Sequence, residues 1–181
     1  SRMQYPTGHV AAKLRWLRQG FSLRQGGVAP GYSPPVAGHF VISTQDWHPT
    51  DTVHFEKWPV HCVADTNGSA FHPELDVEKI DLKLLKGTEN KDDGYSAFEA
   101  TNTSLTDYLK ENNIGSVYVT GLATDYCVRA SALDAVRGGL HTYVVTDAIR
   151  AVNLEPGDDK KTLDELYANG VILIESDEIQ F

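Results

Sequence analysis

Residues 116–139, SVYVTGLATDYCVRASALDAVRGG, predict a buried strand, a tight turn and an amphipathic helix. The strand is expected over residues 117–120, because VYVT consists of β-branched and aromatic side chains. The helix is indicated by apolar residues that recur at helical spacing, namely Val128, Ala132, Leu133 and Val136. Gly138 and Gly139 are expected to end the helix, because glycine tolerates the left-handed conformation of a helix C-terminus.

Cys127 falls in the first turn of this expected helix, where Thr124 or Asp125 is expected to provide the N-cap. The N-terminal end of a helix dipole favours an anion, so we expect the pKa of the thiol to fall and a nucleophilic thiolate to be available. Most free cysteines are instead small buried hydrophobic residues. This position alone leaves both interpretations open.

Strands and helices alternate along the rest of the chain. Further strands are predicted over residues 39–44, within 77–85, over 142–146 and over 171–175. One helix is predicted after Thr103 or Ser104, either of which could cap it, with Leu105, Tyr108 and Leu109 on one face. A second helix is predicted over residues 158–169, with Leu163, Leu166 and Tyr167 facing inward. The alternation predicts a single-domain α/β fold of three layers, α/β/α, with a mostly parallel, Rossmann-like sheet. Sites in such sheets lie at the carboxyl ends of strands, where Asp46, Lys86 and Cys127 fall.

Residues 1–38 differ from the remainder of the chain. They contain five basic residues and no acidic residue, and residues 20–38 are rich in glycine and proline. A short helix is conceivable over residues 10–17, and the glycine- and proline-rich part is expected to form a loop. We therefore expect an atypical N-terminal segment over residues 1–38 and one compact domain over residues 39–181.

The composition excludes several classes of protein. A chain of 181 residues with 41% hydrophobic residues suits one packed domain. Its net charge of −9 argues against a nucleic-acid groove, which needs a basic surface. We expect no membrane segment, because no apolar run approaches about 20 residues. Two cysteines and no recognisable export signal predict a cytoplasmic protein, and a homo-oligomer remains open.

The segment QDWHPTDTVHFEKWPVHC, residues 45–62, concentrates groups that bind metals: Asp46, His48, His54 and His61. One carboxylate with several imidazoles suits zinc, iron or manganese. The alternative is a solvated loop whose histidines have no joint role. Lys86, at a strand end, would ordinarily be a solvated charge. Aromatic residues in the same loops, Trp58 and Tyr95, with Phe98 close by in sequence, could pack in the core or line a pocket.

The segments GLATDYCVR, ALDAVRGG, DWHPTDTVHF, WPVHC and GYSAFE together resemble the isochorismatase-like cysteine hydrolases, and within them the nicotinamidases (pyrazinamidases). The resemblance implies an isochorismatase-like fold over residues 39–181. It implies Asp46, His48 and His61 as metal ligands, with His54 as a further ligand of some members. Zinc is the metal it favours, with iron or manganese as alternatives.

The resemblance also implies roles around the thiol. Cys127 would be the nucleophile and Lys86 the catalytic lysine. The backbone N–H groups of Ala123 and Cys127 would form an oxyanion hole, after a cis peptide between Leu122 and Ala123. Substrate-binding residues would be Trp58, Tyr95 and Leu122.

The activity implied is metal-dependent hydrolysis of nicotinamide to nicotinate and ammonia, in NAD salvage. The family's first-strand aspartate has no counterpart, because no aspartate or glutamate precedes Asp46. Two alternatives remain open: a relative that binds metal and a small amide without turnover, and a hydrolase of another small amide.

Overall fold

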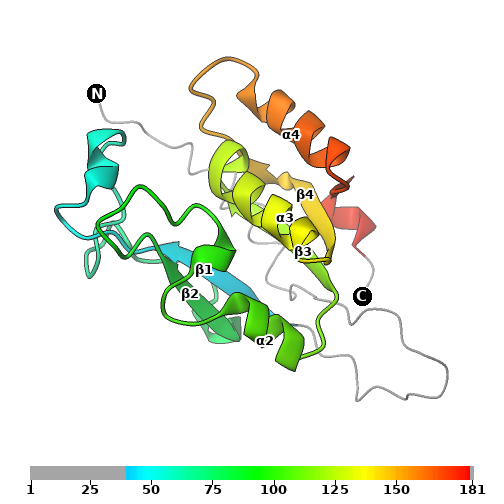
Figure 1. The fold of residues 1–181 in the computed structure, drawn as a ribbon, viewed down its shortest axis with the longest axis horizontal. Helices are drawn as coiled ribbons and strands as arrows, with labels where there is room; N and C mark the ends of the chain where they lie inside the picture. The colour runs from blue at the N-terminus through cyan, green and yellow to red at the C-terminus, as the bar shows by residue number, and fades with distance from the viewer. Residues whose placement is uncertain (1–39, 180–181) are drawn as a thin grey trace.

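The computed structural model describes residues 40–179 of the chain, and Figure 1 shows their arrangement as parallel strands flanked by helices. The strands are β1 (Ile42–Asp46), β2 (Leu82–Lys86), β3 (Ser116–Leu122), β4 (His141–Arg150) and β5 (Ile172–Ile174). The helices are α2 (Leu105–Glu111), α3 (Arg129–Arg137) and α4 (Asp158–Ala168). The predicted α/β fold of one domain with parallel strands is confirmed.

The strands form two parallel sheets within the described residues, where the sequence predicted one. β1 pairs with β2, and β4 lies between β3 and β5. The register of β1 and β2 sets Asp46 beside Lys86 at their carboxyl ends. Since paired residues of neighbouring parallel strands point to the same face, these two side chains lie next to each other. This register positions half of the candidate site.

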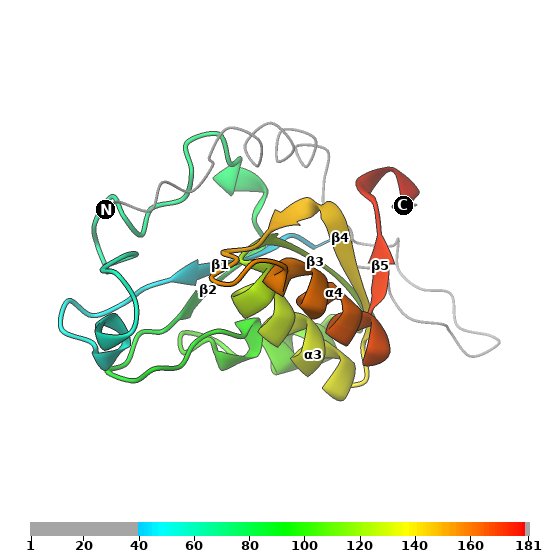
Figure 2. The ribbon, with the colours of Figure 1, turned by 90° about the horizontal axis from the view of Figure 1, so that it is seen from above.

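Two hydrophobic clusters form the core. Helices α3 and α4 cover one face of β3–β4–β5, as Figure 2 shows, and they bury Ala132, Leu133 and Leu166 against Val144 and Ile149. The second cluster packs α2 against β2 and includes Leu84, Ala97, Leu105, Leu109 and Ile114. The sheets are thus held mainly by helices that bury one apolar face each.

The predicted elements exist, with shifted bounds. The strand predicted over residues 39–44 is β1, which starts at Ile42 and continues to Asp46. The strand predicted within residues 77–85 is β2, which starts at Leu82, after the short 3₁₀ turn η3 (Val77–Lys79). The strand predicted over residues 142–146 is β4, which extends to Arg150. The helix considered over residues 10–17 lies outside the described residues. Ser104 caps α2, and Gly138 follows the last residue of α3, both as predicted.

One predicted core residue is wrong. Tyr167 of α4 is 72% exposed, whereas Leu166 is fully buried. Successive helical residues are about 100° apart around the axis, so Tyr167 turns away from the face that carries Leu166. In the part of the chain that the structure describes, no helix combines the length and apolar character needed to cross a membrane.

Candidate active site

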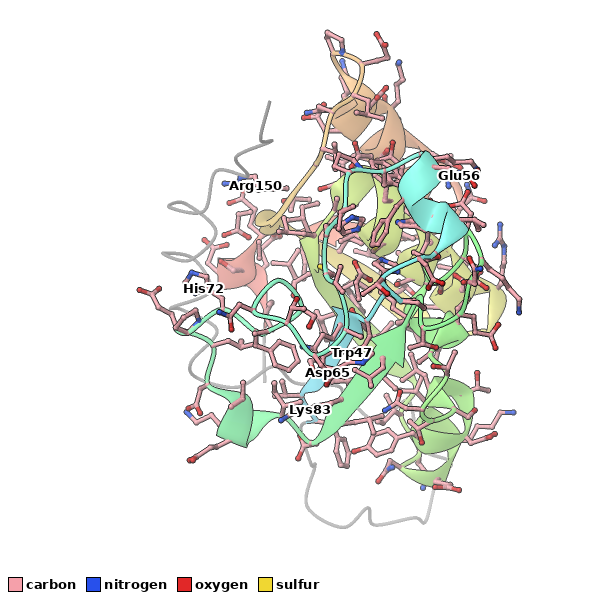
Figure 3. The ribbon with its side chains drawn as sticks, turned by 90° about the vertical axis from the view of Figure 1, so that its left-hand side faces the viewer. Trp47, Glu56, Asp65, His72, Lys83 and Arg150 are labelled. Carbon is pink, nitrogen blue, oxygen red and sulfur yellow. The ribbon has the colours of Figure 1, made fainter. Side chains whose placement is uncertain are left out.

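Three histidines from the loop after β1 meet at one point. His48 follows β1, His54 belongs to the short helix η2 (Val53–Glu56), and His61 lies in the loop beyond it. One ring nitrogen from each histidine lies within 4.8 Å of the others. In Figure 3, Trp47 and Glu56 mark the start of this segment and the end of η2. We call these three residues the histidine cluster.

Each histidine is oriented by an oxygen that contacts its Nδ1 atom. The acceptors are the Gly87 carbonyl for His48 (2.9 Å), the Asp92 carboxylate for His54 (3.0 Å) and the Pro59 carbonyl for His61 (2.7 Å). A carbonyl or carboxylate oxygen accepts a hydrogen bond, so each Nδ1 carries the proton and each Nε2 keeps a free lone pair. Ligand histidines in metalloproteins are typically anchored in this way.

The histidine cluster fits a divalent transition metal. Imidazole nitrogens suit zinc, and three protein ligands with an open position are typical of catalytic zinc sites. Burial lowers the pKa of His48 and thereby favours the neutral ring that a metal requires, although the nearby Asp46 charge acts in the opposite direction. The predicted ligands His48, His54 and His61 are therefore brought together by the fold.

Gly87 is required for the position of His48. Its φ is +64°, and a Cβ atom there would lie 2.4 Å from Cε1 of His48. Such a distance is too short for two carbons, so any side chain would displace either the ring or the Gly87 carbonyl that anchors it. Glycine at this position lets the loop after β2 approach the histidine cluster.

We expect Gly87→Ala to lower the zinc affinity of the protein at least about 10-fold, because it displaces an anchored ligand. Gly139→Ala is the matched control. Gly139 also has a positive φ, +82°, but a Cβ atom there would meet nothing within 4 Å. In both variants the positive φ should lower the free energy of unfolding by about 1–2 kcal/mol, because alanine disfavours the left-handed conformation. Equal zinc affinities of the two variants, measured by competition with a chelator, would contradict the role of Gly87.

Lys86 is a buried cation at the end of β2. Its Nζ atom donates to the Gly94 carbonyl at 2.8 Å, approaches Cys127 Sγ at 3.3 Å and pairs with the Asp46 carboxylate. Burial acts to lower the pKa of Lys86, but the charge of Asp46 and the hydrogen bonds with Asp46 and Cys127 outweigh burial and raise it. The lysine therefore remains an ammonium ion beside the thiol, rather than the solvated charge that is usual at a strand end.

Cys127 lies at the helix start, as predicted, but its surroundings differ from the prediction. It belongs to one π-helical turn, η5 (Thr124–Val128), which begins after Ala123 and has no side-chain cap. Asp125, a predicted cap, instead accepts hydrogen bonds from the backbone N–H groups of Val152 (3.0 Å) and Asn153 (2.8 Å).

The expected fall in the pKa of Cys127 is wrong. Burial raises this pKa, and the nearby charge of Asp46 acts in the same direction. Lys86 and a hydrogen bond from the backbone of Ala123 oppose the rise without cancelling it. Desolvation disfavours the charged form of a thiol, and here its effect on the pKa outweighs the opposite effect of the helix dipole. The resting site therefore holds a thiol, with an ammonium in contact to stabilise the thiolate once it forms.

The peptide bond between Leu122 and Ala123 is cis, as the motif predicted. Leu122 is 50% exposed at the end of β3, and Ala123 follows it immediately before η5. The backbone of Ala123 contacts Cys127. The roles of Leu122 in substrate binding, and of the Ala123 and Cys127 N–H groups as an oxyanion hole, stay predictions.

Three aromatic rings pack against one another beside the histidine cluster. The Trp58 ring is 6.2 Å from His54, and Trp58 Nε1 donates to the Tyr95 hydroxyl at 3.0 Å. Tyr126 completes the group, with its ring centroid 4.7 Å from Trp58 and 6.1 Å from Tyr95. We call Trp58, Tyr95 and Tyr126 the aromatic group.

Tyr126 was missed from the sequence, although its position directly before Cys127 was the available signal. Phe98, which the sequence analysis considered as a residue that could line the same pocket, packs instead against the hydrophobic cluster that includes α2.

Asp46 contacts Lys86, and its role as a metal ligand stays a prediction. The three histidines converge without it, and its Oδ1 atom contacts Lys86. The physical reason is the parallel pairing of β1 and β2, which aligns Asp46 with Lys86. Its charge still acts to raise the pKa of His48.

A thiol in η5, in contact with a buried ammonium at the carboxyl end of β2, suits a hydrolase that acts through a cysteine. The Isochorismatase domain model matches residues 36–178, so this chain belongs to the isochorismatase family.

Within that family the chain is similar to nicotinamidases. It is 35% identical to the nicotinamidase of Acinetobacter baylyi, over 84% of this chain and 89% of the relative. The solved nicotinamidase/pyrazinamidase of Acinetobacter baumannii superposes with a TM-score of 0.77 and 31% identity, covering 94% of this chain and 86% of the other. The zinc-bound pyrazinamidase of Pyrococcus horikoshii gives a TM-score of 0.67 and 35% identity, with 76% and 75% covered.

Proposed function

We propose that this chain hydrolyses nicotinamide to nicotinate and ammonia in NAD salvage, with Cys127 as the nucleophile and zinc as the metal. The observation that carries the proposal is the contact of 3.3 Å between Cys127 Sγ and the buried Lys86 ammonium, in a chain similar to nicotinamidases over most of its length. The histidine cluster and the aromatic group next to this contact support a flat heteroaromatic substrate.

The aromatic group is suited to holding a pyridine ring. Trp58 and Tyr95 both lie near His54, and Tyr126, the residue directly before Cys127, packs against Trp58 and Tyr95. The aromatic group therefore extends from the histidine cluster to the residue next to the thiol. Stacked or edge-on aromatic pairs contribute about 0.5–1.5 kcal/mol beyond the area they bury. A metal held by His48, His54 and His61 would supply a Lewis acid for the ring nitrogen.

The chemistry proceeds through a covalent intermediate. The Cys127 sulfur forms a bond to the carboxamide carbon, the bond from carbon to nitrogen breaks, and the thiol proton leaves with ammonia. Water then cleaves the thioester, giving nicotinate and restoring the thiol. Lys86, in contact with the sulfur, would stabilise the negative charge that develops there, and the N–H groups of Ala123 and Cys127 would donate to the oxyanion.

The test is ammonia release from nicotinamide by protein loaded with zinc or stripped with a chelator. We expect release that depends on zinc. Benzamide is the matched control substrate, since it lacks the ring nitrogen, and it should react much more slowly.

The same assay separates the alternatives. Zinc binding without ammonia release from any amide would contradict the proposal and favour a binding protein, in line with the lack of an acidic residue before Asp46. Release from other small amides but not from nicotinamide would show a different amidase.

A further inference from the structure

Asp92 lies in the loop after β2 and contacts two parts of the candidate site through one oxygen atom. Its Oδ1 atom lies 3.0 Å from His54 Nδ1 and accepts a hydrogen bond from the Tyr95 hydroxyl at 2.9 Å. Its other oxygen, Oδ2, pairs with Lys57, whose side chain is 68% exposed. Oδ1 therefore joins the histidine cluster to the aromatic group, whereas Oδ2 makes an ion pair at the surface.

His54 depends on this carboxylate for its orientation. The other two histidines of the cluster are anchored by backbone carbonyl oxygens, whereas His54 is anchored by a side chain. His54 is 4% exposed, and its ring stacks on that of His48 with 4.5 Å between the centroids. A buried N–H group without an acceptor is costly, so the ring is stable in this position only while Asp92 accepts from Nδ1. A carboxylate on the far nitrogen also makes an imidazole a stronger metal ligand.

Tyr95 depends on the same oxygen. Its hydroxyl donates to Asp92 and accepts from Trp58 Nε1 at 3.0 Å. A carboxylate has only acceptor sites, and its charge strengthens each hydrogen bond that it accepts. Asp92 therefore orients Tyr95 directly, and through the Tyr95 hydroxyl it orients Trp58.

We infer that Asp92 is a positioning residue that sets the orientation of His54 in the histidine cluster and of Tyr95 in the aromatic group. One oxygen atom would thereby keep a metal held by the cluster and a substrate ring held by the aromatic group in a fixed relation. This role lies within the proposed hydrolysis, and so the inference rests on the proposed function. Asp92 was not predicted from the sequence, where it is one of several polar residues in ENKDD, residues 89–93.

The first test measures the zinc affinity of Asp92 variants by competition with a chelator. We expect Asp92→Ala to bind zinc about 10–100-fold more weakly than the parent, because His54 loses its anchor. Asp92→Asn guards against misfolding of the alanine variant. It keeps an acceptor oxygen but loses the charge, so its affinity should lie between those of the parent and Asp92→Ala.

Asn90→Ala is the matched control for the connection between the two loops. Asn90 belongs to the same loop as Asp92, and its Oδ1 atom accepts from the backbone N–H of Val53 at 2.7 Å. It therefore ties η2 to this loop through the backbone rather than through a ring. Asn90→Ala should bind zinc like the parent.

His54→Ala, with and without Asp92→Ala, decides whether Asp92 acts through His54. Adding Asp92→Ala to His54→Ala should not weaken zinc binding further, because the ring that Asp92 orients is already absent. A loss by the same factor in both backgrounds would show a general effect on the loop and overturn the inference. Parental zinc affinity in every Asp92 variant that folds, or an equal loss in Asn90→Ala, would also overturn it.

The kinetics of ammonia release from nicotinamide test the contact with Tyr95. Tyr95→Phe leaves His54 anchored, so it should keep the zinc affinity of the parent and raise KM about 2–10-fold with little change in kcat. With zinc at saturation, Asp92→Ala should also raise KM, and adding Tyr95→Phe to it should raise KM little further. Additive rises in KM would overturn the assignment to Tyr95. If the parent released no ammonia, the proposed function would fail, but the zinc affinities would still decide the role of Asp92 at His54.

Discussion

Replacing Cys127 by alanine is expected to reduce ammonia release from nicotinamide to background, a loss on the order of 10⁶-fold, as for other enzymes that lose their nucleophile. Alanine has no atom that could form the thioester, and Lys86 alone cannot replace it. Zinc content should stay at the parent level, because Cys127 comes from η5 whereas the histidine cluster comes from the loop after β1. The measurement is steady-state ammonia release with parallel elemental analysis.

Cys62→Ala is the control for this result. Cys62 is the other cysteine, and burial raises the pKa of its thiol to about 11, so it is a poor nucleophile at neutral pH. We expect this variant to retain most of the parent activity. Substantial turnover by purified Cys127→Ala protein would eliminate the thiol mechanism, and mass spectrometry of an arrested reaction should locate the acyl group on Cys127 in the parent.

Removing a ring from the histidine cluster is expected to have the second-largest effect. Loss of a residue that only orients a metal ligand costs about 10–100-fold in affinity, so loss of the ligand itself in His48→Ala or His61→Ala should cost more. Both variants should also bind nicotinamide more weakly, because the ring nitrogen loses its partner. Competition with a chelator measures the zinc affinity. Titration with nicotinamide measures substrate binding, and it is carried out in variants that also carry Cys127→Ala, so that no turnover occurs.

His141→Ala is the matched control, since His141 is an exposed histidine at the start of β4 and lies outside the cluster. Its zinc affinity should equal that of the parent. If His48→Ala and His61→Ala both keep full zinc occupancy under chelator competition, the histidine cluster is not the metal site.

Local sequence patterns were sufficient for the order of the elements and for most of the residues at the site. Helical and strand periodicities report which face of an element is buried, and that information is local. The strand, turn and helix around Cys127 were predicted for this reason. The motifs in the loop after β1 and at the end of β2 placed the three histidines and Lys86 at the same edge as the thiol, because parallel strands present their carboxyl ends at one edge.

Three features followed only from the packing of distant segments. The pKa of Cys127 is raised because the effect of burial outweighs the effect of the helix dipole. Burial depends on the elements that surround the thiol. Asp46 contacts Lys86 because β1 and β2 pair in one particular register. Tyr126 joins the aromatic group because η5 turns its ring towards Trp58.

The sequence by itself determined the chemical inventory of the site, a thiol, an ammonium, one carboxylate and three imidazoles, since these are properties of residues and their spacing. The tertiary structure decided how these groups are paired: the carboxylate with the ammonium, the ammonium with the thiol, and the imidazoles with one another. The first two pairings depend on strand register and burial, which join residues about 40 positions apart and leave no trace in local periodicity, whereas the three imidazoles come from one loop.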